Sequence, residues 1–193
     1  MLLPNAVRRI AGAAFAGSVL STFLAAGLVA AGLTAAGLTA APAAAADPRH
    51  LGTFKDWNAF LFEEKGQKVC YISSQPKKTE PKAKRGDIYT LVTHRPAEKA
   101  LDVVSVIVGY PFKKGSDAEV SIDGKDFKLF TDGETAWARD ADGDRAVTTA
   151  LRNGKQMVVK GVSGRGTKTT DTYSLAGVGQ AYEAINEACG VKR

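Results

Sequence analysis

The sequence predicts a mainly β protein: an antiparallel β-sandwich or partly open barrel with one short helix and a C-terminal helix. Three observations support this fold class. Short runs rich in β-branched and aromatic residues dominate the chain after residue 46. Turn residues separate several of these runs, and the pair Asp123-Gly124 is the clearest example. An apolar stripe with helical spacing lies near the C-terminus.

The first 46 residues have the composition of a secretory signal peptide. Arg8 and Arg9 form a short basic region, and no other charged residue precedes Asp47. A long apolar stretch follows the arginines and ends near the small residues Ala44 and Ala46, the A-x-A pattern that signal peptidase recognises. We therefore expect export through an N-terminal signal peptide that is cleaved after Ala46.

Cleavage would leave residues 47–193 as one β-rich domain in the periplasm or outside the cell. It would also lower the formal net charge from +6 to +4, because only two arginines are removed. The alternative is a retained membrane anchor, since about 20 apolar residues suffice to span a bilayer. The abundance of alanine and glycine and the A-x-A pattern favour cleavage. Membrane contact is expected only through this N-terminal segment, if it is retained.

The predicted strands are short and closely spaced. Residues 102–110 (DVVSVIVGY) are almost continuously apolar, which is typical of a strand in the middle of a sheet. Gly66 predicts a hairpin between the first two strands, and Asp123-Gly124 predicts another, because both positions of a tight hairpin turn need positive φ. In chain order, the predicted strands cover residues 57–62, 68–73, 87–93, 102–110, 118–122, 125–130, 135–138, 157–162 and 167–173.

Two segments have helical patterns. Asp144 is predicted to cap a short helix that ends at Asn153-Gly154. Ser174 is predicted to cap the C-terminal helix, and Gly190 to end it. The apolar residues of this second helix recur every three or four positions, so they share one face. They are Leu175, Val178, Tyr182, Ile185 and Cys189.

The chain has two cysteines, Cys70 and Cys189. Disulfides persist in oxidising compartments, so an exported domain with two cysteines is expected to join them. Cys189 lies on the apolar stripe of the C-terminal helix, where it could meet a buried strand residue such as Cys70. The alternative is a pair of buried free thiols.

Candidate catalytic groups are few. His50 lies in what the sequence predicts to be a mobile tail, and His94 ends a predicted strand beside Pro96. Neither histidine has the spacing of a metal ligand, and we expect no metal ion and no cofactor. A hydrolase that uses His94 with a nearby carboxylate is the remaining catalytic alternative, and it requires His94 to line a cleft.

Residues 76–85 form the most pronounced cluster of charge, a polar and proline-rich loop with five cations and one anion. The cations are Lys77, Lys78, Lys82, Lys84 and Arg85. One interpretation is a solvated loop that keeps the protein soluble. The other is an anion-binding site for an acidic envelope lipid, a glycan or a partner protein. Nucleic acid is not an expected ligand, because no aromatic residues accompany the lysines to stack on bases.

Several strings of residues together carry a family resemblance. They are VCYI at 69–72, LVTHRP at 91–96, GYPF at 109–112, AWA at 136–138, MVVKG at 157–161, RGT at 165–167 and DTYSL at 171–175, with the closing Cys189. In these strings the chain resembles the invasion-associated locus B protein family of alphaproteobacteria over nearly all of residues 54–190. The resemblance implies an exported β-sandwich domain of the periplasm or cell surface, and it carries over no catalytic residues. Founding members of the family are linked to host-cell invasion, whereas many relatives belong to free-living bacteria.

The sequence therefore predicts an exported, non-enzymatic binding protein of the cell envelope, whose partner is an unknown envelope ligand or protein. The first alternative is a membrane-anchored envelope assembly factor that keeps its N-terminal segment. The second is the hydrolase built around His94.

Overall fold

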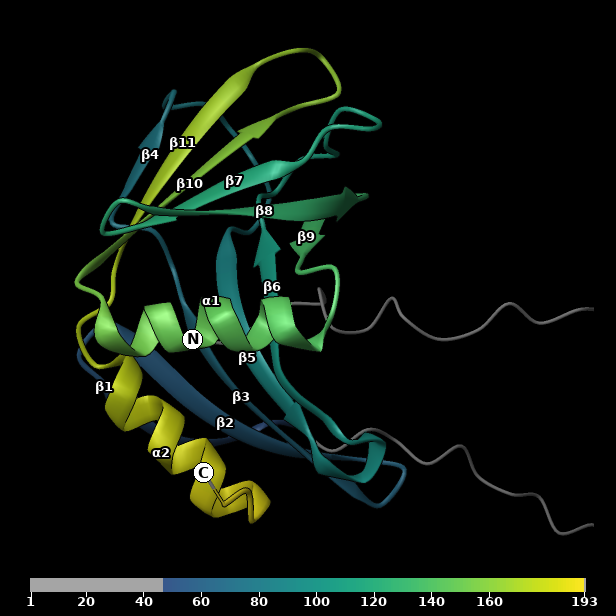
Figure 1. The fold of residues 1–193 in the computed structure, drawn as a ribbon, viewed down its shortest axis with the longest axis vertical. Helices are drawn as coiled ribbons and strands as arrows, with labels where there is room; N and C mark the ends of the chain where they lie inside the picture. Colours follow the sequence, from purple (N-terminus) through teal and green to yellow (C-terminus); the bar gives the residue numbers. More distant parts are fainter. Residues whose placement is uncertain (1–46, 193) are drawn as a thin grey trace, which may run out of the picture. The chain divides into compact units, whose positions relative to one another are not determined.

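The computed structural model describes residues 47–192, which form an antiparallel sheet of eleven strands with two α-helices (Figure 1). The strands are β1 (Arg49–Phe54), β2 (Trp57–Glu64), β3 (Gln67–Ser74), β4 (Lys78–Glu80), β5 (Tyr89–Arg95), β6 (Ala100–Ile107), β7 (Ala118–Ile122), β8 (Lys125–Asp132), β9 (Thr135–Trp137), β10 (Gln156–Val162) and β11 (Lys168–Ser174). The helices are α1 (Ala141–Asn153) and α2 (Val178–Cys189), and a 3₁₀ turn, η2 (Pro96–Glu98), follows β5. The predicted mainly β fold class is confirmed. The predicted signal peptide lies outside the described residues.

The sheet is continuous and open, with the strand order β1-β2-β3-β5-β6-β9-β8-β7-β10-β11-β4. We call β1, β2, β3, β5 and β6 the first half-sheet, and β4, β7, β8, β10 and β11 the second. The short strand β9 joins them, because it pairs with β6 on one side and with β8 on the other. Figure 1 shows the strands of the two half-sheets running in different directions on either side of β9.

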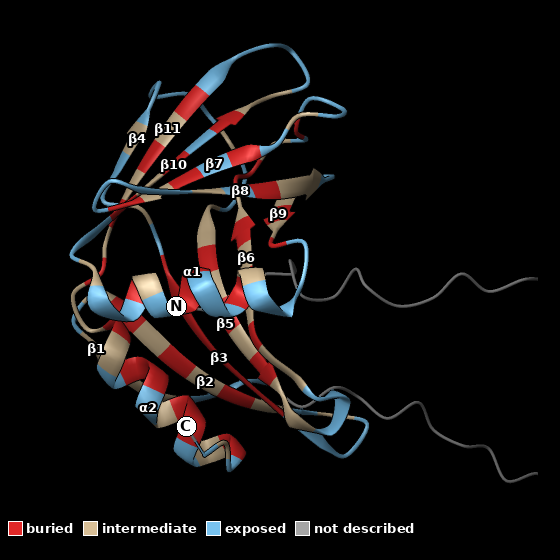
Figure 2. Ribbon diagram, in the orientation of Figure 1, coloured by how far each residue is buried: buried red, intermediate tan, exposed pale blue. Residues whose placement is uncertain are grey.

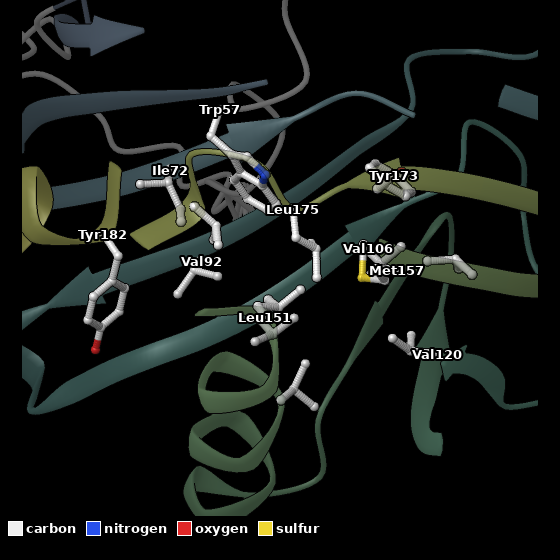
Figure 3. Packing of buried hydrophobic residues seen from close by; sticks show 14 of the residues in the cluster. Trp57, Ile72, Val92, Val106, Val120, Leu151, Met157, Tyr173, Leu175 and Tyr182 are labelled. Atoms are coloured by element: carbon white, nitrogen blue, oxygen red, sulfur yellow. The ribbon is translucent and has the colours of Figure 1, made fainter. Parts of the chain in front are cut away.

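The hydrophobic core lies on the inner face of the sheet, between the two half-sheets and the helices (Figure 3). The first half-sheet contributes Trp57 and Val106, the second contributes Met157, and all three are fully buried. Leu151 of α1 and Tyr182 of α2 complete this core from the helical side. Each such apolar side chain contributes roughly 1.5–3 kcal/mol when it leaves water, so this face holds the two half-sheets and the helices together.

Both predicted hairpins are present. Lys65 and Gly66 have φ of 53° and 76°, and Asp123 and Gly124 have φ of 46° and 87°. Positive φ at both turn positions matches the right-handed twist of the flanking strands. The pairs β2–β3 and β7–β8 are therefore joined by the tight hairpin turns that the sequence predicts.

The prediction that Asp144 caps α1 was wrong by one turn. The cap is Asp140, whose side chain accepts a hydrogen bond of 2.7 Å from the Gly143 N–H. Asp144 lies inside the first helical turn, and its carboxylate accepts a bond of 2.8 Å from the Val104 N–H on β6. Two aspartates four residues apart offer the same local signal, and the contact with β6 decides which one caps.

The start of α2 also differs from the prediction. Ser174 is the last residue of β11, and its hydroxyl accepts a bond of 3.2 Å from the Ala176 N–H. The helix begins at Val178 after Gly177, which has φ of 95°. The predicted apolar stripe is otherwise confirmed, because Val178, Tyr182, Ile185 and Cys189 are all buried.

Sequence patterns missed two edge strands. Residues 49–54, expected to be a mobile tail, form β1, in which the His50 ring packs against Phe60 at a centroid distance of 5.1 Å. The register of β1 shifts between His50 and Gly52, so the strand lacks regular alternation of apolar and polar residues. The three-residue strand β4 is polar and lies inside the predicted loop.

No helix within residues 47–192 is long and apolar enough to cross a membrane.

Gly177 offers a direct test of how the chain enters α2. A Cβ at this position would lie 1.9 Å from the Phe54 carbonyl oxygen, and φ is already in the left-handed region. We expect Gly177→Ala to lower the free energy of unfolding by at least about 2 kcal/mol, because strain and clash add. The measurement is urea unfolding followed by circular dichroism.

Gly179→Ala is the matched control, because a Cβ at Gly179, inside α2, meets nothing within 4 Å. We expect it to be neutral or to stabilise by up to about 1 kcal/mol. Equal effects of the two substitutions would contradict the described path of the chain.

Candidate functional site

A disulfide joins Cys70 on β3 to Cys189 at the end of α2, as the sequence predicts. The two Cα atoms are 6.1 Å apart, and 119 positions separate the residues in the sequence. Closing a loop of this length restricts the unfolded chain and contributes about 4–5 kcal/mol in the chain-entropy model. The bond therefore holds α2 against the inner face of the first half-sheet.

His94 lies beside this disulfide, since Cys70 and His94 are directly paired between β3 and β5. Its Nδ1 atom accepts a hydrogen bond of 3.0 Å from the Asp102 N–H. A backbone N–H can only donate, so Nδ1 carries no proton in this arrangement. Nε2 then donates to the Asn186 side-chain oxygen at 3.0 Å. His94 thus connects β6 to α2.

Asp102 is the second centre of this buried cluster. Its φ of 64° is unusual for a residue other than glycine. Its carboxylate accepts a hydrogen bond of 2.5 Å from the Tyr182 hydroxyl, and its carbonyl accepts one of 3.2 Å from Thr148. Burial raises the pKa of the nearby Asp144 carboxyl, and the Val104 N–H opposes that shift. These contacts fix both helices to the first half-sheet.

The position of His94 bears on the hydrolase alternative. The side chain has no exposed surface. It lines neither of two surface hollows of about 170 and 190 Å³, one beside Arg95 and Glu98 and the other beside Phe127 and Lys160. A hydrolase that uses His94 requires a cleft, and this requirement is not met. Among residues 47–192 no group of three or more His, Cys, Asp or Glu side chains could hold a metal ion.

The predicted basic loop divides into two parts with different roles. Arg85 points into the protein, where its guanidinium forms a two-pronged ion pair with Asp171 of β11. The Arg85 and Asp171 side chains are only 6% and 1% exposed. Arg85 also lies over the Tyr110 ring at 5.7 Å from its centroid. Arg85 therefore belongs to the interior, which leaves four lysines in the candidate anion-binding segment.

Two of the four lysines have carboxylate neighbours. Lys77 pairs with Asp56 in the turn between β1 and β2, and its hydrogen bond is the main reason that the pKa of the Asp56 carboxyl is lowered. Lys78 pairs with Glu80 across 2.8 Å. Lys82 and Lys84 are exposed and have no ion pair with any residue in 47–192.

The segment that carries Lys82 and Lys84 is short and fixed at both ends. We call residues 81–84 the lysine loop. On one side, β4 pairs with β11, and the Lys77 N–H donates to the Thr172 carbonyl at 2.7 Å. On the other side, the Arg85–Asp171 pair and a 2.8 Å bond from the Gly86 N–H to the Gly109 carbonyl hold the chain. Both lysines thus project from a loop whose two ends are held in place.

The sequence analysis missed a surface on the opposite side of the first half-sheet. Side chains on the outer face of β2, β3, β5 and β6 are largely apolar and form what we call the aromatic face. It is centred on Phe60, Phe62, Tyr71, Leu91, Val103 and Ile107. Phe60 and Tyr71 stack with ring centroids 5.0 Å apart, and burial raises the pKa of Tyr71 to about 12. Apolar residues at both odd and even positions of these strands were the available signal.

The fold and the site define a small antiparallel β domain whose C-terminal helix is held by one disulfide. The family model of the Invasion associated locus B (IalB) protein matches residues 57–186. The chain therefore belongs to the invasion associated locus B family, as its sequence strings suggest.

The comparison with solved structures agrees with this assignment. The chain is similar to the crystal structure of invasion associated protein B from Bartonella henselae, with a TM-score of 0.50 and 15% identity. The match covers 71% of this chain and 95% of the Bartonella chain. At this identity the likeness shows the fold alone. No curated protein matches the chain.

The buried Arg85–Asp171 pair is expected to be important for stability. Asp171→Asn would leave the guanidinium buried without a counter-charge, and we expect a loss of about 3–5 kcal/mol in the free energy of unfolding. Chemical denaturation of the purified protein provides the measurement.

Asp117→Asn is the matched control, because Asp117 pairs with Arg139 where both side chains are at least 36% exposed. We expect a change below about 1 kcal/mol. A loss from Asp171→Asn no larger than that of the control would show that the buried pair is not needed.

Proposed function

We propose that this protein is an exported, non-enzymatic binding protein of the cell envelope whose lysine loop holds an anionic ligand. The observation that supports this proposal best is the geometry of the loop. Lys82 and Lys84 extend from a short segment whose ends are fixed by the β4–β11 pairing and by the Arg85–Asp171 ion pair. Because both ends of the lysine loop are fixed, less conformational entropy is lost when a ligand binds.

The charge of the segment selects the chemical class of the ligand. Lys77 and Lys78 add two cations beside the lysine loop, although each has a carboxylate neighbour. A lysine ammonium interacts with phosphate or carboxylate groups mainly as a point charge, so it requires no special ligand geometry. Phosphate-bearing lipids and acidic glycans share this chemistry.

A role in binding fits the remaining features better than catalysis does. The invasion associated locus B family is not a known enzyme family, and His94 is committed to Asp102 and Asn186 in the interior. Export is supported by the composition of residues 1–46 and by the disulfide, which is typical of an oxidising compartment.

Export can be tested by the intact mass of the protein recovered from the envelope fraction of cells that express the full chain. We expect a chain that begins at Asp47 and lacks the two thiol hydrogens of Cys70 and Cys189. Thiol alkylation should add mass only after reduction. A full-length mass in the membrane fraction would contradict cleavage and favour an anchored protein.

Ligand binding can be tested with phosphatidylcholine vesicles that contain or lack phosphatidylglycerol, and with polygalacturonate as an acidic polysaccharide. Lys82→Gln/Lys84→Gln should weaken binding about 30-fold at low salt, because each lysine near an anionic surface contributes about 1 kcal/mol. Cosedimentation measures the vesicle arm, and titration calorimetry measures the polysaccharide arm.

The control variant is Lys113→Gln/Lys114→Gln, which makes the same change of charge at two other exposed positions. It should retain most of the binding. If the two double variants bind alike, net charge rather than the lysine loop determines the affinity. If the wild-type protein binds neither probe, the anionic-ligand proposal is wrong.

A further inference from the structure

The two half-sheets have different outer faces. On the second half-sheet the outward positions are mostly polar or charged, as Glu119, Lys128 and Lys160 illustrate. On the first half-sheet no outward position between the strand ends of β2, β3, β5 and β6 carries a charge. Figure 2 shows that the exposed residues of these four strands are confined to the strand ends.

The aromatic face is continuous across the strands. Direct cross-strand pairing places Phe60 beside Tyr71, Tyr71 beside Thr93, and Thr93 beside Val103. The next row joins Ser73, Leu91 and Ser105 in the same way. Apolar and aromatic side chains thus alternate with small hydroxyls over one uncharged surface.

Neither α-helix within residues 47–192 packs on this face. Helix α2 packs on β1, β2, β3 and β5, and α1 packs on β6. Both helices occupy the inner face, where Cys70 holds α2 and the Val104 N–H meets Asp144 of α1. Strands with apolar residues on both faces are typical of sheets that are covered on both sides.

The absence of charge on the aromatic face limits what can cover it. Residues 47–193 have a formal net charge of +4. An acidic partner would be attracted to the cations of the domain, and these lie outside the aromatic face. A partner that covers the aromatic face must itself present an uncharged apolar surface. A second copy of the chain supplies such a surface, with the same shape and in equal amount. Most homo-oligomers are twofold dimers that bring the same patch of each subunit together.

The size of the face suits a weak, reversible dimer. Four strands about 4.8 Å apart extend over about 19 Å, and three rows of outward side chains cover about 20 Å. This flat footprint is about half of the roughly 800 Å² that each partner buries in a standard interface, which places the contact among small, reversible ones. Depletion of charge and enrichment of aromatic side chains are also typical of interface cores.

We propose that two copies of this protein dimerise face to face through the aromatic face of the first half-sheet. The two first half-sheets would then pack as the layers of a sandwich, about 10 Å apart. Each dimer would carry two lysine loops, and an anionic surface that reaches both would bind more tightly than it binds one copy.

The test is sedimentation velocity on protein recovered from cells that express the full chain, over a wide range of concentration. We expect a reversible dimer. Leu91→Lys/Val103→Lys should raise its dissociation constant at least about 100-fold, because the new charges would be buried without partners. Leu91→Thr/Val103→Thr, a milder change at the same two positions, should raise it about tenfold and guards against failure to fold.

Val158→Lys/Thr170→Lys is the matched control. These residues are also outward, part-exposed and diagonal to each other on neighbouring strands, but they lie on the second half-sheet. The control should remain dimeric. Native mass spectrometry identifies what else could occupy the aromatic face. A monomer at every concentration, a complex with lipid or another protein in place of the dimer, or equal effects of the two lysine variants would overturn the proposal.

Discussion

The attachment of α2 to the first half-sheet is the constraint on which most of the structure depends. The helix is held at its end by the bond between Cys70 and Cys189, and along its length by Tyr182 and Asn186. These contacts reach strands that are far from the helix in the sequence, with separations of 119, 92 and 80 residues, so they close long loops of the domain. The histidine and aspartate that the helix meets, His94 and Asp102, are fully used in that role. Their chemistry serves packing, which explains why two titratable side chains lie fully buried in the core.

The second half-sheet depends on a different contact. Strand β9 is only three residues long, so its hydrogen bonds alone make a narrow connection between the half-sheets. The buried pair of Arg85 and Asp171 adds a second connection, from the segment that leads into β5 to the middle of β11. A buried ion pair rarely contributes much net stability compared with apolar residues, but it tolerates few alternative arrangements. It therefore fixes where the lysine loop leaves the sheet.

Local patterns were sufficient for most of the fold. Alternating or continuous apolar runs located nine strands, the Asp-Gly pair set one hairpin, and the helical stripe placed Cys189 on the buried side of α2. The patterns failed where long-range contacts decide. Asp140 and Asp144 compete for the same cap, and only β6 distinguishes them. Arg85 looked like its lysine neighbours because nothing nearby in the sequence indicates that Asp171 lies opposite. The aromatic face was hidden because an apolar strand does not reveal whether its second face is covered by its own chain.

The two edges of the sheet have a consequence for how the protein avoids misassembly. An exposed edge offers unpaired backbone groups to any other strand, which is how many β proteins begin to aggregate. Here β4 is three residues long and is followed at once by Pro81, and β1 is interrupted by the irregularity at Gly52. Neither edge offers a long, flat run of backbone. Newly made chains should therefore resist amyloid-like stacking even when they are crowded.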